Sequence, residues 1–168
     1  MAGRVDVGFC PAVRVTDLPA ALHAVALAEE PVDRVVIAAS HPLARREALT
    51  LRELVEMPML LPERAVYPAM YDHCVQELRR SGREPQVLVA PPSPAAAAGL
   101  VAAGAGFIVG FRSFAMTPPP GTVVLPIVDA SITVQLFALR RASDERPLVL
   151  AFLDCLRAVY RDGEGSAP

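Results

Sequence analysis

The sequence predicts an α/β protein, because short apolar strands alternate with helices along the chain. Three segments carry this prediction. A T-x-x-E capping box at Thr50 and Glu53 starts a short helix, which Met57-Pro58 ends. Residues 68–81 form an amphipathic helix with proline at its first position, and residues 93–110 read as a capped helix, a glycine turn and a buried strand.

Strands are predicted where apolar residues alternate with polar ones or run together between turn residues. The first strand alternates, with Val5, Val7 and Phe9 on one face. HPLARR, after Ser40, predicts an exposed turn. The predicted strands are 4–9, 22–27, 34–39, 59–61, 86–89, 107–109, 122–128 and 132–139.

A terminal helix is predicted from Pro147 onward. Its apolar stripe is expected to consist of Leu148, Phe152, Leu156 and Val159, spaced mostly four residues apart. Residues 162–168 are expected to form a disordered tail.

The segment 93–110 suggests a ligand site. Ser93 is the expected N-cap and Pro94 the first helical residue, while Gly104 provides the positive φ of a C-cap. Ligands of open α/β sheets bind outside the carboxyl ends of strands, and helix N-termini favour anions. A carboxylate ligand is therefore the first expectation, and the alternative is an ordinary crossover helix with nothing bound.

Composition excludes several classes of protein. The 168 residues are 53% hydrophobic, with no charged residue from Pro85 to Phe111, but prolines at 91, 92 and 94 argue against a membrane span there. The N-terminus lacks a signal-peptide pattern, so a cytoplasmic protein is expected. All 16 basic residues are arginine, the formal charge is −2, and no basic cluster predicts nucleic-acid binding by this chain.

Sequence motifs for catalysis or metal binding are not found. Cys10, Cys74 and Cys155 are widely spaced and unpaired, which predicts buried thiols rather than a zinc site or disulfides. The three histidines lack ligand spacing, and no G-x-S-x-G, P-loop or G-x-G-x-x-G motif occurs in its required context. We therefore expect no metal, no cofactor and no enzymatic activity.

The order of segments resembles the effector-binding region of a LysR-type transcriptional regulator. The segments are RVDVGF, EEPVDRVVIAASHPLA, LRELVEMPMLLPER, PAMYDHCVQELRRSGREPQV, GLVAAGAGFIVG and VVLPIVD, of which HPLA and GLVAAGxG are the most specific. The resemblance covers residue 4 to about residue 160 and is closest to the subgroup that senses carboxylates of aromatic catabolism.

The resemblance implies a periplasmic-binding-protein-like type II fold of two α/β lobes, with the effector in the cleft between them and lobe closure as the switch. Lobe II would be complete at residues 32–107, and lobe I would be partial, made of residues 1–31 and 108–161. The family's winged helix-turn-helix, linker helix and first half of lobe I have no counterpart in this sequence.

The resemblance also implies the candidate effector-binding residues. They are Pro62, Arg64 and Pro68 in one loop, Ser93 and Pro94 at the helix start, and Arg4 near a second site of the aromatic-sensing subgroup. Arg64 is the expected carboxylate clamp, although a loop arginine also pairs with a nearby acid such as Glu63.

The expected function is a small-molecule effector-binding module that senses an organic, aromatic-derived acid without transforming it. The expected partners are this acid and a second copy of the chain, with DNA bound only through a domain absent from this sequence and no membrane involved. The alternative is a free-standing module that binds a small ligand or a partner protein and never contacts DNA.

Overall fold

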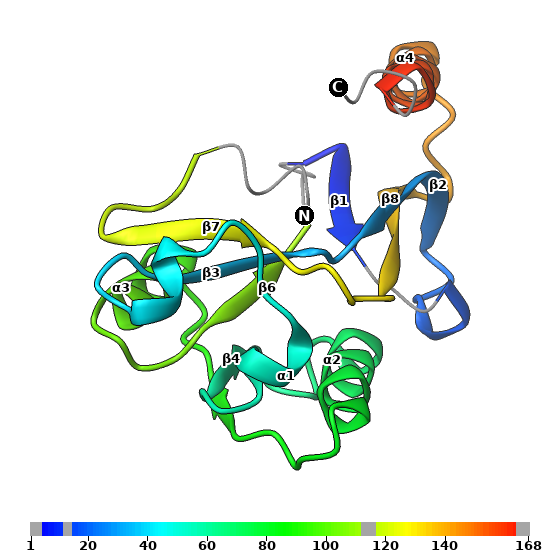
Figure 1. The fold of residues 1–168 in the computed structure, drawn as a ribbon. Helices are drawn as coiled ribbons and strands as arrows, with labels where there is room; N and C mark the ends of the chain where they lie inside the picture. The colour runs from blue at the N-terminus through cyan, green and yellow to red at the C-terminus, as the bar shows by residue number, and fades with distance from the viewer. Residues whose placement is uncertain (1–4, 12–14, 112–116, 164–168) are drawn as a thin grey trace. The chain divides into compact units, whose positions relative to one another are not determined.

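The computed structural model describes residues 5–11, 15–111 and 117–163 (Figure 1). The chain divides into two compact units. Unit 1 combines Met1–Glu30 with Val134–Pro168, and unit 2 is the continuous stretch Pro31–Thr133. The predicted alternation of strands and helices is confirmed in both units.

Unit 1 is a three-stranded sheet with a helix packed on it. The strands β1 (Val7–Pro11), β8 (Thr133–Arg141) and β2 (Leu22–Pro31) follow the order β1-β8-β2, and a 3-10 turn, η1 (Val15–Asp17), precedes β2. β1 and β8 are antiparallel, with Val7 opposite Arg140. The last helix, α4 (Pro147–Gly163), follows β8.

The predicted apolar stripe of α4 is wrong for Leu148, Phe152 and Val159 and is confirmed for Leu156. The helix buries Val149 and Leu153 against β2 and β8, and Leu156 and Tyr160 pack at the edge of this cluster. Leu148 is instead 82% exposed, and Phe152 and Val159 are also exposed. Two rows of apolar residues share the same spacing, and only the sheet surface selects which row is buried. The helix reaches Gly163, so residues 162 and 163 are helical rather than part of the expected disordered tail. Residues 164–168 lie outside the described residues.

Unit 2 contains two small sheets. β3 (Arg34–Ala38) lies between β6 (Ile108–Gly110) and β7 (Thr122–Pro126) and is antiparallel to both. β4 (Met59–Leu61) and β5 (Val87–Val89) form a parallel pair. Because β6 and β7 both pair with β3, this unit continues to Thr133 rather than ending at residue 107.

In the described part of unit 2, three α-helices and one 3-10 helix accompany the sheets. They are η2 (Pro42–Arg45), α1 (Leu51–Leu54), α2 (Pro68–Arg80) and α3 (Pro94–Ala102). The predicted capping box of α1 is confirmed, since the Thr50 hydroxyl accepts from the Glu53 N–H and the Glu53 carboxylate accepts from the Thr50 N–H. The exposed turn predicted at HPLARR is η2, in which His41 Nδ1 accepts from the Leu43 N–H.

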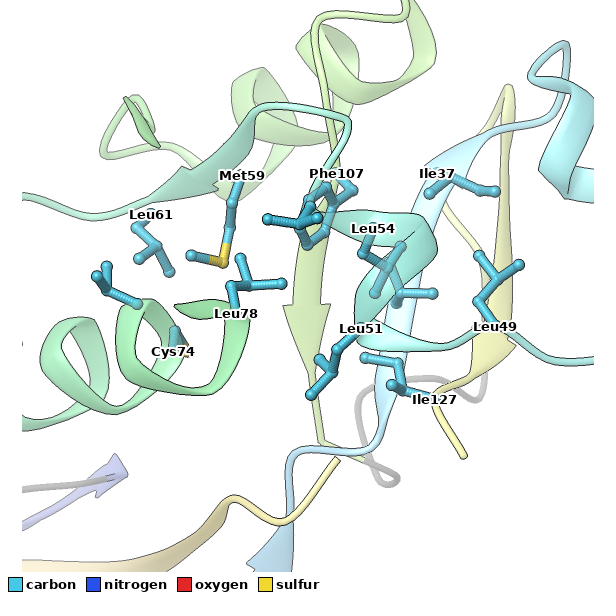
Figure 2. Packing of buried hydrophobic residues seen from close by; sticks show 13 residues of the cluster. Ile37, Leu49, Leu51, Leu54, Met59, Leu61, Cys74, Leu78, Phe107 and Ile127 are labelled. Carbon is cyan, nitrogen blue, oxygen red and sulfur yellow. The ribbon is translucent and has the colours of Figure 1, made fainter. Parts of the chain in front are cut away.

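The core of unit 2 gathers apolar residues from both sheets, α1 and α2 (Figure 2). Its fully buried members include Ile37, Leu54, Met59, Leu78 and Phe107.

The three cysteines differ in environment. Cys74 is buried in this core, which raises the pKa of its thiol to about 12, whereas Cys10 is half-buried and Cys155 is exposed, contrary to the prediction for it. No helix within the described part of the chain is long and apolar enough to cross a membrane.

A network of ionised side chains holds the start of α4. The Asp144 carboxylate accepts hydrogen bonds from Arg146 and Arg141, and Arg146 also pairs with Asp6. Hydrogen bonds from Arg146 lower the pKa of Asp144 well below its usual range, against the opposing effect of its burial. The network therefore connects β1, the end of β8 and α4.

This network predicts acid sensitivity of unit 1. Because the pKa of Asp144 is lower in the folded than in the unfolded chain, its contribution to stability is present above pH ~3.9 and is lost as the pH falls below that value. Asp144→Asn is expected to make the free energy of unfolding less dependent on pH, measured by urea denaturation between pH 7 and about pH 3. Asp154→Asn, at an exposed site of α4, is the control and is expected to retain the wild-type slope.

Gly106 lies where the two sheets of unit 2 meet. A Cβ atom at this residue would approach the Pro58 carbonyl oxygen to 2.1 Å and Leu60 Cδ1 to 2.8 Å. The same Pro58 oxygen accepts a hydrogen bond from the Phe107 N–H at 2.9 Å. Only glycine permits this close approach of two backbone segments.

We therefore expect Gly106→Ala to lower the free energy of unfolding by about 3 kcal/mol, since rigid backbone must move to admit the methyl group. Gly99→Ala is the control from the same segment. Its Cβ would point into open space on α3, so better helix propensity should raise stability by about 0.5 kcal/mol. Equal losses in the two variants would contradict this account.

Candidate functional site

The start of α3 leaves the Ala95 N–H without an intrahelical acceptor. Ser93 Oγ accepts from the Ala96 N–H at 3.4 Å, and the Ser93 carbonyl accepts the first helical bond, from Ala97 N, at 3.0 Å. Pro94 has no N–H, and the Ala95 N–H lies too early in the helix for an intrahelical acceptor. The predicted cap is confirmed, and this helix end carries partial positive charge.

A pocket of about 760 Å³ lies against this helix start, within unit 2. Strands β3, β4 and β6 supply Val36, Leu60 and Ile108 to its wall. The other lining residues are Pro62, Tyr67, Ala90, Pro91, Pro92, Pro94, Ala95, Ala97, Ala98, Gly99, Pro119 and Pro120. Among these described residues, the phenol of Tyr67 is the one polar side chain and none is charged.

The loop of residues 62–67, between β4 and α2, forms one wall of the pocket through Pro62 and Tyr67. Arg64, from the same loop, faces a different hollow. Its Nε and Nη2 donate to the two carboxylate oxygens of Asp72 at 2.6 and 2.8 Å, and this bidentate pairing raises the pKa of the arginine.

The second hollow, of about 660 Å³, lies along α2 and holds two ion pairs. Besides Arg64 and Asp72 it is lined by Arg79 and Glu84, which are joined by hydrogen bonds of 2.8 and 2.5 Å. The arginines and carboxylates of this hollow are paired with one another. The described lining of the apolar pocket instead consists mainly of apolar side chains and carries no charge.

The structure brings together only some of the residues expected at the site. Pro62 and Pro94 line the apolar pocket, and Ser93 adjoins it as the cap of α3. Arg64 pairs with Asp72 rather than with Glu63, and Pro68 begins α2 without being among the lining residues. Arg4 lies outside the described residues.

Sequence reasoning missed several members of the pocket. Tyr67 directly precedes Pro68 and was recognisable as an aromatic residue in a candidate loop, but no pattern assigned it to the site. Pro119 and Pro120 also contribute to the wall, and no sequence pattern points to them. Val36, Leu60 and Ile108 are ordinary strand residues, which only the fold brings to one place.

The lining favours a small molecule with an apolar body. Such a body would lose its contact with water against the prolines, alanines and aliphatic side chains. A polar or anionic end has two possible partners, the Ala95 N–H at the start of α3 and the Tyr67 phenol. In the described part of the chain, no group of three or more His, Cys, Asp or Glu side chains could hold a metal ion.

Fold and pocket define a ligand-binding α/β domain, and comparison with known proteins identifies its family. The family model described as the LysR substrate binding domain matches residues 1–161. The chain therefore belongs to the LysR substrate-binding domain family, and the resemblance drawn from its segments is confirmed.

Among curated relatives, the HTH-type transcriptional regulator TfdS of Cupriavidus pinatubonensis is 35% identical over 136 residues. This alignment covers 79% of this chain and 44% of the regulator, so the chain spans less than half the length of that relative.

Solved structures of LysR regulators share the fold. CbnR has a TM-score of 0.74 at 21% identity, over 92% of this chain and 52% of that chain. CbnR has also been solved at full length with its target DNA, with a TM-score of 0.74 and 21% identity over 95% of this chain and 55% of that chain. The effector-binding domain of BenM with its effector benzoate has a TM-score of 0.70 at 23% identity, over 98% of this chain and 73% of that domain. The expected mixed α/β fold of the periplasmic-binding-protein-like type II class is confirmed.

Proposed function

We propose that this chain is the effector-sensing portion of a LysR-type transcriptional regulator and that it binds a small organic acid without transforming it. The observation that carries the proposal is the apolar pocket at the start of α3, which combines room for an apolar body with the Ala95 N–H and the positive end of the helix dipole at its edge. The benzoate of the BenM domain, an apolar ring with one carboxylate, has the chemistry that these walls favour.

The proposed acid-binding residues are Ser93 and Pro94 at the helix start, Pro62 and Tyr67 in the facing loop, and Val36, Leu60 and Ile108 at the base. An acid with an aromatic or aliphatic body would place its carboxylate toward the Ala95 N–H, where the helix dipole favours negative charge. Its body would lie against Leu60 and Ile108.

We further propose that DNA is bound by a separate domain, as the chain's formal charge of −2 and the coverage of about half of CbnR support. The regulator would act as a homo-oligomer in the cytoplasm, where its DNA target is located. Binding of the acid would change the populations of two conformations of the regulator, because a ligand shifts such an equilibrium by its difference in affinity for the two states.

Benzoate is the first probe for this function. Adding it to the purified chain is expected to raise the thermal unfolding temperature in a concentration-dependent way, because a ligand that binds only the folded state stabilises that state. Proton NMR should show benzoate unchanged after prolonged incubation. Consumption of the acid would indicate an enzyme, and no shift with any of a panel of aromatic and aliphatic acids would contradict the proposed function.

Filling the pocket should weaken this binding. Ala95→Leu adds a branched side chain on a lining residue of α3 and is expected to weaken benzoate binding by about tenfold or more, measured by isothermal titration calorimetry. Ala96→Leu is the matched control, since Ala96 is exposed on the same helical turn and is not among the lining residues. Equal affinities of the two variants would place the acid elsewhere.

A further inference from the structure

The loop that forms one wall of the apolar pocket is connected to α2 by an ion pair. Arg64 lies in the sequence between Pro62 and Tyr67, the two pocket-lining residues of this loop. Its guanidinium donates two hydrogen bonds, of 2.6 and 2.8 Å, to the carboxylate of Asp72 on α2. The fork of a guanidinium fixes both distance and orientation toward a carboxylate. The contact therefore restrains the middle of the loop against a rigid helix.

Backbone contacts restrain the loop less firmly. The Val66 N–H donates to the Glu63 carbonyl at 2.8 Å, and the Tyr67 N–H reaches the same oxygen only at 3.5 Å. Tyr67 occupies the N-cap position of α2 with φ −135° and ψ 68°, and it makes no side-chain capping hydrogen bond. The described backbone bonds thus close a turn but do not tie its middle to α2.

The chain offers a second ion pair of the same kind as a reference. Arg79 and Glu84 also form a bidentate pair in the hollow along α2, with side chains that are 57% and 69% exposed, against 63% and 41% for Arg64 and Asp72. Neither Arg79 nor Glu84 belongs to the pocket loop. The two pairs therefore have similar chemistry and exposure, and they differ in whether a pocket wall depends on them.

We propose that Arg64 and Asp72 are positioning residues of the ligand pocket: their ion pair holds the loop 62–67 so that Pro62 and Tyr67 form its wall, and Arg64 acts through the loop without contacting the ligand. The proposal rests on the proposed function for its effect on affinity. It assigns to Arg64 a role different from the carboxylate clamp expected from the resemblance, because the Nε and Nη2 edge of its guanidinium is engaged by Asp72 and the side chain lines the hollow along α2 rather than the apolar pocket.

The effect on the loop is measured without any ligand. Amide hydrogen exchange of Val66 and Tyr67 should become about threefold faster in Arg64→Gln and in Asp72→Asn, in keeping with the modest free energy of an exposed ion pair. Glu84→Gln, which breaks the reference pair, should leave these two amides at the wild-type rate. The double variant Arg64→Asp with Asp72→Arg restores a pair of opposite charges and should recover most of the protection.

The effect on the pocket is measured by calorimetry with benzoate as the probe. Arg64→Gln and Asp72→Asn should weaken binding by similar factors of about threefold, while Glu84→Gln binds as the wild type does. A much larger loss in Arg64→Gln than in Asp72→Asn would overturn the positioning role and show that Arg64 contacts the acid directly.

The two measurements also separate this proposal from the proposed function. Unchanged exchange of Val66 and Tyr67 in both variants would overturn the positioning role, whether or not benzoate binds. Faster exchange together with no binding of benzoate or of the acid panel by the wild type would support the restraint on the loop and reject the proposed function. Equal thermal unfolding temperatures of the three single variants would show that the effect is local rather than a general loss of stability.

Discussion

The close contact between Gly106 and the Pro58 carbonyl is the constraint on which unit 2 depends. At this point the Phe107 N–H donates to Pro58 and the Phe107 carbonyl accepts from the Leu60 N–H, so the chain leaving α3 is joined to β4. The same residues continue into β6, which pairs with β3. One backbone junction therefore connects the two sheets of this unit, and a side chain at residue 106 would separate them.

The pocket follows from this junction. Leu60 lies on one side of it and Ile108 on the other, and both belong to the pocket wall. The helix that opens onto the pocket ends just before the junction, with Gly104 in a positive-φ conformation at φ 83°. The position of the α3 N-terminus relative to the apolar wall is thus set by backbone packing, and small residues along α3 allow it to lie close to the sheet.

No charged side chain is among the described residues that line the apolar pocket. The arginines of the neighbouring hollow are satisfied by carboxylates of the same hollow, as in Arg64 with Asp72 and Arg79 with Glu84. Among the described lining residues of the pocket, Tyr67 has the one polar side chain, and the positive end of the α3 dipole lies at the pocket's edge. Such a division suits a ligand with one small polar group and a larger apolar body.

The sequence by itself determined the features that depend on neighbouring residues. The capping box at Thr50, the cap at Ser93 and the helix after Pro68 were predictable, because each arises from contacts within one or two turns of chain. The strand at Met59 was predictable from its apolar run, although its pairing partner Val87 lies in a distant segment. The family was recognisable for a related reason, since the order of these local segments is itself a pattern in the sequence.

Only the tertiary structure decided the features that depend on distant partners. Which face of α4 is buried, how far unit 2 extends, and which acid holds Arg64 each require a surface or side chain far away in the sequence or on another element. Two rows of positions on α4 are apolar, and Glu63 and Asp72 both stand near Arg64 in the sequence, so the local pattern does not choose between them. Packing selects among them, because only one choice satisfies the sheet, the helices and the paired charges together.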